Sequence, residues 1–115
     1  MTQEEKELLL KDLCARLPYG VKVAYLASTY NVDYIESKFD EIKLENLDCT
    51  IDLGNVKPYL RPLESQTDEE MEERNDCVGD VMRMDYYYSH HLDCHQLIKK
   101  GLALEAPEGM YKLQK

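Results

Sequence analysis

The residues best suited to chemistry in this sequence lie in one short stretch, HHLDCH, from His90 to His95. It holds every histidine of the chain, together with an aspartate and one of the four cysteines. If a helix continued through it, His91 and His95 would be four residues apart, with Cys94 beside them. Imidazole and thiolate groups at this spacing can bind a soft metal ion. One hypothesis is therefore a metal site at His91, Cys94 and His95.

The same stretch also has the pattern of a corner between two helices. Asp93 and Gln96 fit the N-cap and N3 positions of a capping box. A long helix would then end at about His90 or His91, Leu92 would pack under the bend, and a short helix would begin at Asp93. This break would separate the three metal ligands, and a Cys–His nucleophile needs a geometry that adjacency in sequence does not supply. The sequence favours the corner over a metal site, and over a catalytic or pH-sensing role.

The first half of the chain should supply a helix and a small sheet. Thr2 and Glu5 fit a capping box, leucines recur at intervals of three and four, and Pro18 disfavours helix at Leu17, so we expect a helix from about Gln3 to Arg16. Four segments with alternating apolar residues then predict an antiparallel meander of three or four strands: VKVAYLA, NVDYIES, EIKLE and DCTIDL. The next segment, VKPYLRPLESQ, should be extended but not a central strand, because its prolines donate no hydrogen bond.

The second half should be mainly helical. A second capping box, Thr67 with Glu70, predicts a long helix from Asp68 to about His90. Asp85 projects near the middle of its apolar face, either as an acid paired locally or as a buried functional acid. After the short helix, LALE and MYKL could form a C-terminal hairpin around APEG. The predicted fold class is α+β, in one domain of 115 residues.

Charge and composition restrict the function more than any motif does. The net charge is −9, and the first 82 residues carry nine basic and nineteen acidic side chains, which disfavours binding to nucleic-acid phosphates. The sequence lacks an apolar run of membrane-spanning length and a signal-peptide pattern, and its cysteines show no C-x-x-C spacing. We expect a cytoplasmic protein with reduced thiols, no membrane association and no cofactor; the sequence does not indicate its oligomeric state.

The leading functional hypothesis is a non-enzymatic protein that binds another protein. The sequence has no phosphate-binding loop, nucleophile elbow or dinucleotide-binding pattern. Candidate contact elements are the segment Tyr59–Arg61 and the run Tyr86–Tyr88, and the candidate binding residues are Tyr59, Arg61, Asp85, His90 and His91. The alternatives are the metal site and a nucleic-acid-associated protein whose C-terminal third is arranged like a winged helix. Packing of these residues within the fold remains the simpler explanation for each of them.

Three strings resemble a group of short hypothetical proteins from Bacteroides-type gut bacteria and their prophages: LLKDLCARLPYGVKV, VKPYLRPLESQTDEE and HHLD followed by GLALEAPEGMY. They cover about half of the chain. Similar proteins carry an aromatic residue at position 94 and an arginine at position 95, which argues against the metal hypothesis. The resemblance implies a phage or mobile-element setting and no particular activity.

Overall fold

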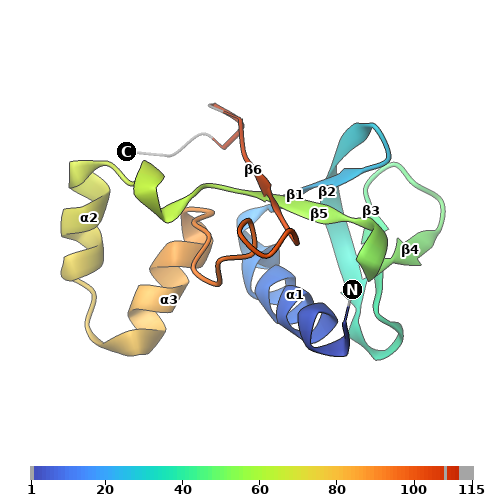
Figure 1. Cartoon of the computed structure of the whole chain (residues 1–115), viewed down its shortest axis with the longest axis horizontal. Helices are drawn as coiled ribbons and strands as arrows, with labels where there is room; N and C mark the ends of the chain where they lie inside the picture. Colours follow the sequence, from blue (N-terminus) through green and yellow to red (C-terminus); the bar gives the residue numbers. More distant parts are fainter. Residues whose placement is uncertain (1, 108, 112–115) are drawn as a thin grey trace.

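An N-terminal helix, a six-stranded mixed sheet and two further helices form an α+β fold (Figure 1). The computed structural model describes residues 2–107 and 109–111. The helices are α1 (Gln3–Arg16), α2 (Asp68–Asn75) and α3 (Gly79–Ser89). The strands are β1 (Lys22–Tyr25), β2 (Ser28–Glu36), β3 (Glu41–Leu44), β4 (Thr50–Asp52), β5 (Lys57–Leu60) and β6 (Leu104–Glu105).

Helix α1 has the bounds that its local sequence predicts. Thr2 Oγ1 accepts a hydrogen bond from the backbone N–H of Glu5 at 3.1 Å, and the Glu5 carboxylate accepts one from the N–H of Thr2 at 2.8 Å. These two bonds complete the expected capping box. At the other end, residues Leu17–Tyr19 form a 3₁₀ turn that closes at Gly20, whose φ of +77° suits glycine. The chain thereby turns from α1 into β1.

The sheet has the strand order β4-β3-β2-β1-β5-β6. Strands β1 to β4 pair antiparallel in sequence order, and the nine-residue β2 pairs with β1 through its first half and with β3 through its second. A register shift between Val32 and Tyr34 interrupts the pairing of β2 with β3. Strand β5 then pairs antiparallel with β1, and β6 pairs parallel with β5. The sheet is therefore larger than the predicted meander, and mixed.

The prediction that the proline segment is not a central strand is wrong, because β5 lies between β1 and β6. Pro58 is opposite Val23 of β1, whereas β6 pairs only with Tyr59 and Leu60. Since the parallel pairing begins beyond Pro58, the strand accommodates a proline and still has a neighbour on each side.

The predicted long helix over residues 68–90 is two helices. Its N-terminal capping box is confirmed, but α2 ends at Asn75, and α3 begins at Gly79, whose φ is +81°. Asn75, Asp76, Val78 and Gly79 all have low helix propensity, and a left-handed residue cannot continue an α-helix. Helix α2 folds back beside α3, and the Tyr86 hydroxyl donates a hydrogen bond to the Glu70 carbonyl at 3.1 Å. The two helices form a hairpin (Figure 1).

The prediction of a short helix beginning at Asp93 is also wrong, because residues 94–101 form turns. Two residues in this region have left-handed backbone, His91 with φ +59° and Gln96 with φ +57°, which prevents a regular helix. Half of the predicted hairpin partner MYKL, residues 112 and 113, lies outside the described residues, and Leu104–Glu105 pair with β5 instead.

The main core lies between α1, the sheet and the turns that follow α3. Its buried side chains are Leu9, Leu13, Val21, Val23, Ile42, Leu44, Leu53, Val56, Leu60, Leu97, Leu102 and Ala103. Neither α2 nor α3 contributes a side chain to this buried cluster, and both lie at the end of the molecule away from β3 and β4 (Figure 1). Within the part of the chain that the structure describes, no helix is both long and apolar enough to cross a lipid bilayer.

Candidate functional site

The HHLDCH stretch forms a corner that backbone and side-chain hydrogen bonds fix against β5. The N–H of Arg61 donates to the carbonyl of His91 at 2.7 Å, and the N–H of Asp93 donates to the carbonyl of Arg61 at 2.9 Å. The Asp93 carboxylate accepts hydrogen bonds from the N–H groups of Leu97 and Ile98, at 2.7 and 3.0 Å. Asp93 therefore caps the following segment, but not through the predicted box with Gln96, and that segment is a series of turns.

Behind this corner lies a buried ion pair that sequence reasoning missed. Asp12 and Arg16 of α1 are both fully buried, and their side chains form two hydrogen bonds, at 2.6 and 3.1 Å. Arg16 also donates to the Leu92 carbonyl at 2.6 Å and lies over the ring of Tyr88, 5.2 Å from its centroid. These contacts link α1, α3 and the corner.

Of the three residues in the metal hypothesis, two lie together with Asp12 instead of with His91. Among residues 2–107 and 109–111, one possible ligand atom from each of Asp12, Cys94 and His95 lies within 4.8 Å of the other two. The guanidinium of Arg16 already binds the Asp12 carboxylate and lies 3.8 Å from Cys94 Sγ. A metal ion at this place would have to displace that positive charge from a buried position.

Burial makes the same groups poor nucleophiles and bases. It raises the pKa of the Cys94 thiol to about 11, so the reactive thiolate is scarce at neutral pH. Burial also lowers the pKa of His95. It raises the pKa of Tyr88 to about 12. The Tyr88 hydroxyl lies 2.9 Å from His95 Nε2. The arrangement stabilises neutral side chains, which suits packing better than proton transfer.

His91 faces away from this group and stacks on Tyr111, with 3.7 Å between the ring centroids. The Tyr111 hydroxyl donates to the carbonyl of Tyr59 at 2.7 Å and accepts from the N–H of Lys22 at 2.9 Å. Burial is the main reason that the pKa of His91 falls to about 4, and the positive charges of Arg16 and Arg61 lower it further. His91 and Tyr59, two predicted binding residues, therefore take part in holding the chain near Tyr111 against the sheet.

Arg61 and His90 meet at Glu70 of α2. Arg61 forms two hydrogen bonds with the Glu70 carboxylate, at 2.8 and 2.9 Å, and His90 Nδ1 lies 3.2 Å from the same carboxylate. The bond to Arg61 is the largest cause that lowers the pKa of Glu70 to about 2. His90 also stacks on Tyr86 of α3, with centroids 4.1 Å apart. These predicted binding residues attach the α2–α3 hairpin to β5.

Asp85, the fifth predicted binding residue, meets neither His90 nor His91. It is exposed on α3 and accepts a hydrogen bond from the hydroxyl of Tyr19, in the 3₁₀ turn after α1. This bond is the main cause that raises the pKa of Tyr19. Asp85 is thus a paired surface acid, and its partner is 66 positions away in the sequence.

A groove between α1 and α3 leaves apolar side chains uncovered. It has a volume of about 420 Å³, and its lining comes from one residue of α1 and five of α3: Ala15, Asp80, Val81, Met84, Asp85 and Tyr88. Residues 81, 84, 85 and 88 follow the spacing of a single helical face. Val81 is 84% exposed, and the neighbouring Val78 and Met82 are 79% and 53% exposed. These exposed apolar side chains lie together on a protein whose surface is otherwise strongly charged.

A larger hollow, of about 740 Å³, lies between the 3₁₀ turn of residues Leu63–Ser65 and the turns after α3. Its lining mixes exposed charges, Glu64, Lys99 and Glu105, with Asp93, whose carboxylate oxygens are both used as backbone acceptors. This hollow is therefore lined largely by polar and charged groups, whereas the groove is lined mainly by apolar ones.

The two features that sequence reasoning missed each had a local signal. Asp12 and Arg16 have the i, i+4 spacing of a helical ion pair, but such pairs are usually solvated. The apolar face predicted for the long helix includes Val81 and Tyr88 but not Met84, which also lines the groove.

No protein-family model, curated protein or solved structure matches this chain.

Proposed function

We propose that this protein is a non-enzymatic binding module that holds a segment of a partner protein in the groove between α1 and α3. The exposed apolar face of α3 is the observation that carries this proposal. Val81 and Met84 line the groove, Val78 and Met82 extend the apolar surface beside it, and none of the four belongs to the buried core. Burying such side chains against a partner is favourable by about 25 cal/mol per Å² of apolar area.

The attachment of α3 supports a binding role. Contacts with polar partners hold the α2–α3 hairpin: Glu70 with Arg61, Tyr86 with the Glu70 carbonyl, and Tyr88 with Arg16. Because these polar contacts hold α3 in place, its apolar face can remain exposed without other side chains packed over it. Flexible methionines at positions 82 and 84 would adapt to a partner's side chains.

A displayed library of random peptides, selected against the purified protein, tests this proposal. We expect enrichment of peptides that bind the native protein but not Val81→Asn, which makes an exposed apolar position of the groove polar. Leu26→Asn is the matched control, because Leu26 is 85% exposed, nearly the same as Val81, but lies in the β1–β2 turn. Selection that yields no peptide sensitive to Val81→Asn would contradict the proposal, as would equal sensitivity to Leu26→Asn.

The phage or mobile-element setting that the sequence resemblance implies is compatible with an accessory protein of this kind. The nucleic-acid alternative stays a prediction. It relied on a short helix after Asp93, where residues 94–101 form turns instead. The metal alternative at His91, Cys94 and His95 also stays a prediction. His91 stacks on Tyr111, whereas Cys94 and His95 lie with Asp12. Neither alternative has an observation in its favour that equals the uncovered apolar groove.

A further inference from the structure

We infer that the groove takes a basic amphipathic helix of a partner protein. This inference rests on the proposed function and adds the chemical class of the partner. Its basis is the combination of an apolar floor with acids in the same lining. Val81, Met84 and Tyr88 supply the apolar contacts, and two exposed acids, Asp80 and Asp85, also border the groove.

The shape of the groove suits a helix. Its α3 wall runs from residue 81 to residue 88, which is about 10 Å along the helix axis, or two turns. Helices α1 and α3 diverge in Figure 1, and a third helix lying along the groove between them could insert apolar side chains at i, i+3, i+4 and i+7. Because Asp80, Val81 and Asp85 are themselves exposed, the groove is an open trough rather than an enclosed ligand cavity.

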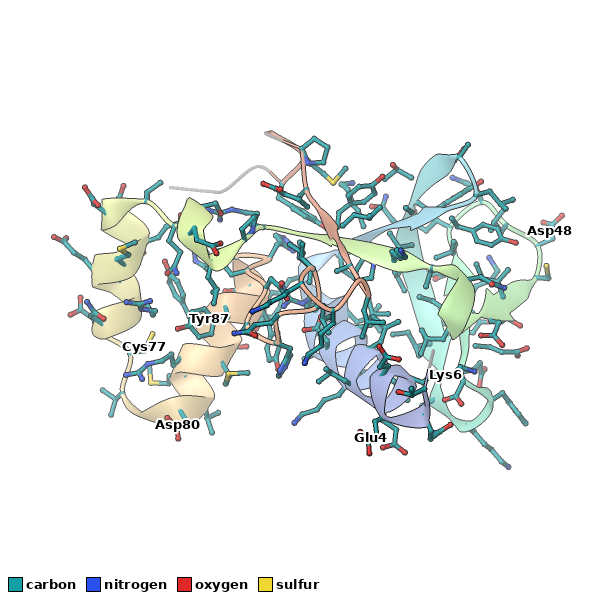
Figure 2. All side chains as sticks on the ribbon, viewed as in Figure 1. Glu4, Lys6, Asp48, Cys77, Asp80 and Tyr87 are labelled. Atoms are coloured by element: carbon teal, nitrogen blue, oxygen red, sulfur yellow. The ribbon has the colours of Figure 1, made fainter. Side chains whose placement is uncertain are left out.

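The negative charge around the groove favours a partner segment with positive charge. Asp80 and Asp85 are in the lining, and the adjoining segment from residue 64 to residue 76 carries seven acids and one arginine. Figure 2 places Asp80 at the end of α3 beside the turn from α2, next to this acidic segment. Lysine or arginine side chains at the edges of an apolar stripe would pair with these carboxylates, which gives both specificity and faster association.

The same charge argues against three other occupants. A second copy of this chain, with its net charge of −9, would bring Asp80 and Asp85 close to the same acids. An anionic lipid surface and a nucleic acid would meet the same repulsion. A basic segment of a different protein is the occupant for which both the apolar floor and the acidic edge are favourable.

Peptides that differ only in charge test the inference directly. The probes are an amphipathic helical peptide of leucine and lysine and its leucine–glutamate counterpart, each labelled for fluorescence anisotropy. We expect saturable binding of the lysine peptide alone, weakening as salt is raised. Val81→Asn should weaken this binding about ten-fold. Asp80→Asn, which removes one edge charge, should weaken it about two- to five-fold.

Asp48→Asn is the matched control for Asp80→Asn, because both aspartates are exposed and Asp48 lies at the opposite end of the molecule (Figure 2). Equal weakening by the two variants would mean attraction to net charge alone and would overturn the inference. Absence of binding by the lysine peptide would overturn it as well. If the displayed library yields neutral or acidic peptides that depend on Val81, the proposed function stands and only the basic partner class is wrong.

Discussion

The corner after α3 and the groove beside it contrast two ways of using reactive or apolar side chains. The corner holds all three histidines, and each one contacts a partner: His90 at Glu70, His91 at Tyr111 and His95 at Tyr88. The groove contains no histidine or cysteine in its lining, and one of its apolar residues, Val81, is 84% exposed. Side chains that look suited to chemistry pack within the fold here, whereas apolar ones on α3 remain exposed. Substitutions in the two regions should therefore fail in different ways.

Replacing Arg16 by methionine should have the largest effect on stability. It leaves the Asp12 carboxylate buried without its positive partner and removes the hydrogen bond to the Leu92 carbonyl. Breaking a buried pair in this way costs about 3–5 kcal/mol. Urea unfolding followed by circular dichroism measures the loss in the free energy of unfolding.

The double variant Asp12→Leu, Arg16→Met separates the cost of an unpaired charge from the cost of lost packing. Since apolar replacement of a whole buried pair is often neutral or favourable, most of the lost stability should return. A loss below about 1 kcal/mol in the single variant would contradict the structural importance of the corner.

Acid should destabilise the fold through His91. The pKa of His91 is lowered from 6.5 to about 4, because burial and the charges of Arg16, Arg61, His90 and Lys22 disfavour its protonation. As the pH falls below 6.5, His91 becomes protonated in the unfolded chain but stays neutral in the folded one, so the free energy of unfolding decreases. Below about pH 4 His91 is protonated in both states, and its contribution is constant. The total is about 3 kcal/mol, from 1.36 kcal/mol per unit of pKa.

The variant His91→Phe tests this pH dependence while it keeps a ring against Tyr111. Its free energy of unfolding should vary less between pH 6.5 and pH 4 than that of the native protein. The same slope in both proteins would show that His91 is not the group responsible.

The link between the α2–α3 hairpin and the sheet should be weaker than the buried pair. Glu70→Gln keeps the shape of the side chain but removes the charge that binds Arg61 and His90. Hydrogen bonds to charged groups contribute about 1.5–3 kcal/mol, and we expect a loss near the lower value. Faster amide hydrogen exchange in residues 68–89 than in the sheet would locate the effect in the hairpin.

The pKa of Glu70 gives this variant a second signature. It is lowered from 4.5 to about 2, so the stabilisation is present above pH 4.5 and is lost as the pH falls toward 2. Glu70→Gln should remove that part of the acid sensitivity. An unchanged pH profile below 4.5 would assign it to other carboxylates.

The sequence predicted those elements whose causes are local. The two Thr–Glu capping boxes form, and α1 begins at Gln3 and ends at Arg16 because Thr2, Glu5 and the following LPYG act within a few residues of each end. The break between α2 and α3 could have been predicted from Asn75, Asp76 and Gly79, but the capping box and the apolar pattern outweighed these residues.

Elements that depend on distant contacts were beyond local reasoning. The burial of Asp12 and Arg16 depends on Leu92, which is 76 positions from Arg16, and the pairing of β6 with β5 joins residues more than 40 positions apart. The corner itself was predicted, because Asp93 caps its own next turn; the partners of its histidines were not, since Glu70 and Tyr111 come from other elements.

Val81→Asn should have the smallest effect on stability and the clearest effect on binding. Because Val81 is 84% exposed, a polar residue there loses little burial in the free protein, and surface substitutions usually change the free energy of unfolding by less than about 0.5 kcal/mol. Thermal unfolding of Val81→Asn and Leu26→Asn should give midpoints close to that of the native protein. If Val81→Asn instead unfolds as readily as Arg16→Met, Val81 is part of the packing that holds α3, and the contrast between corner and groove does not hold. If it stays folded while peptide binding is lost, the apolar face of α3 is free for a partner because the buried polar contacts at its end already hold the helix.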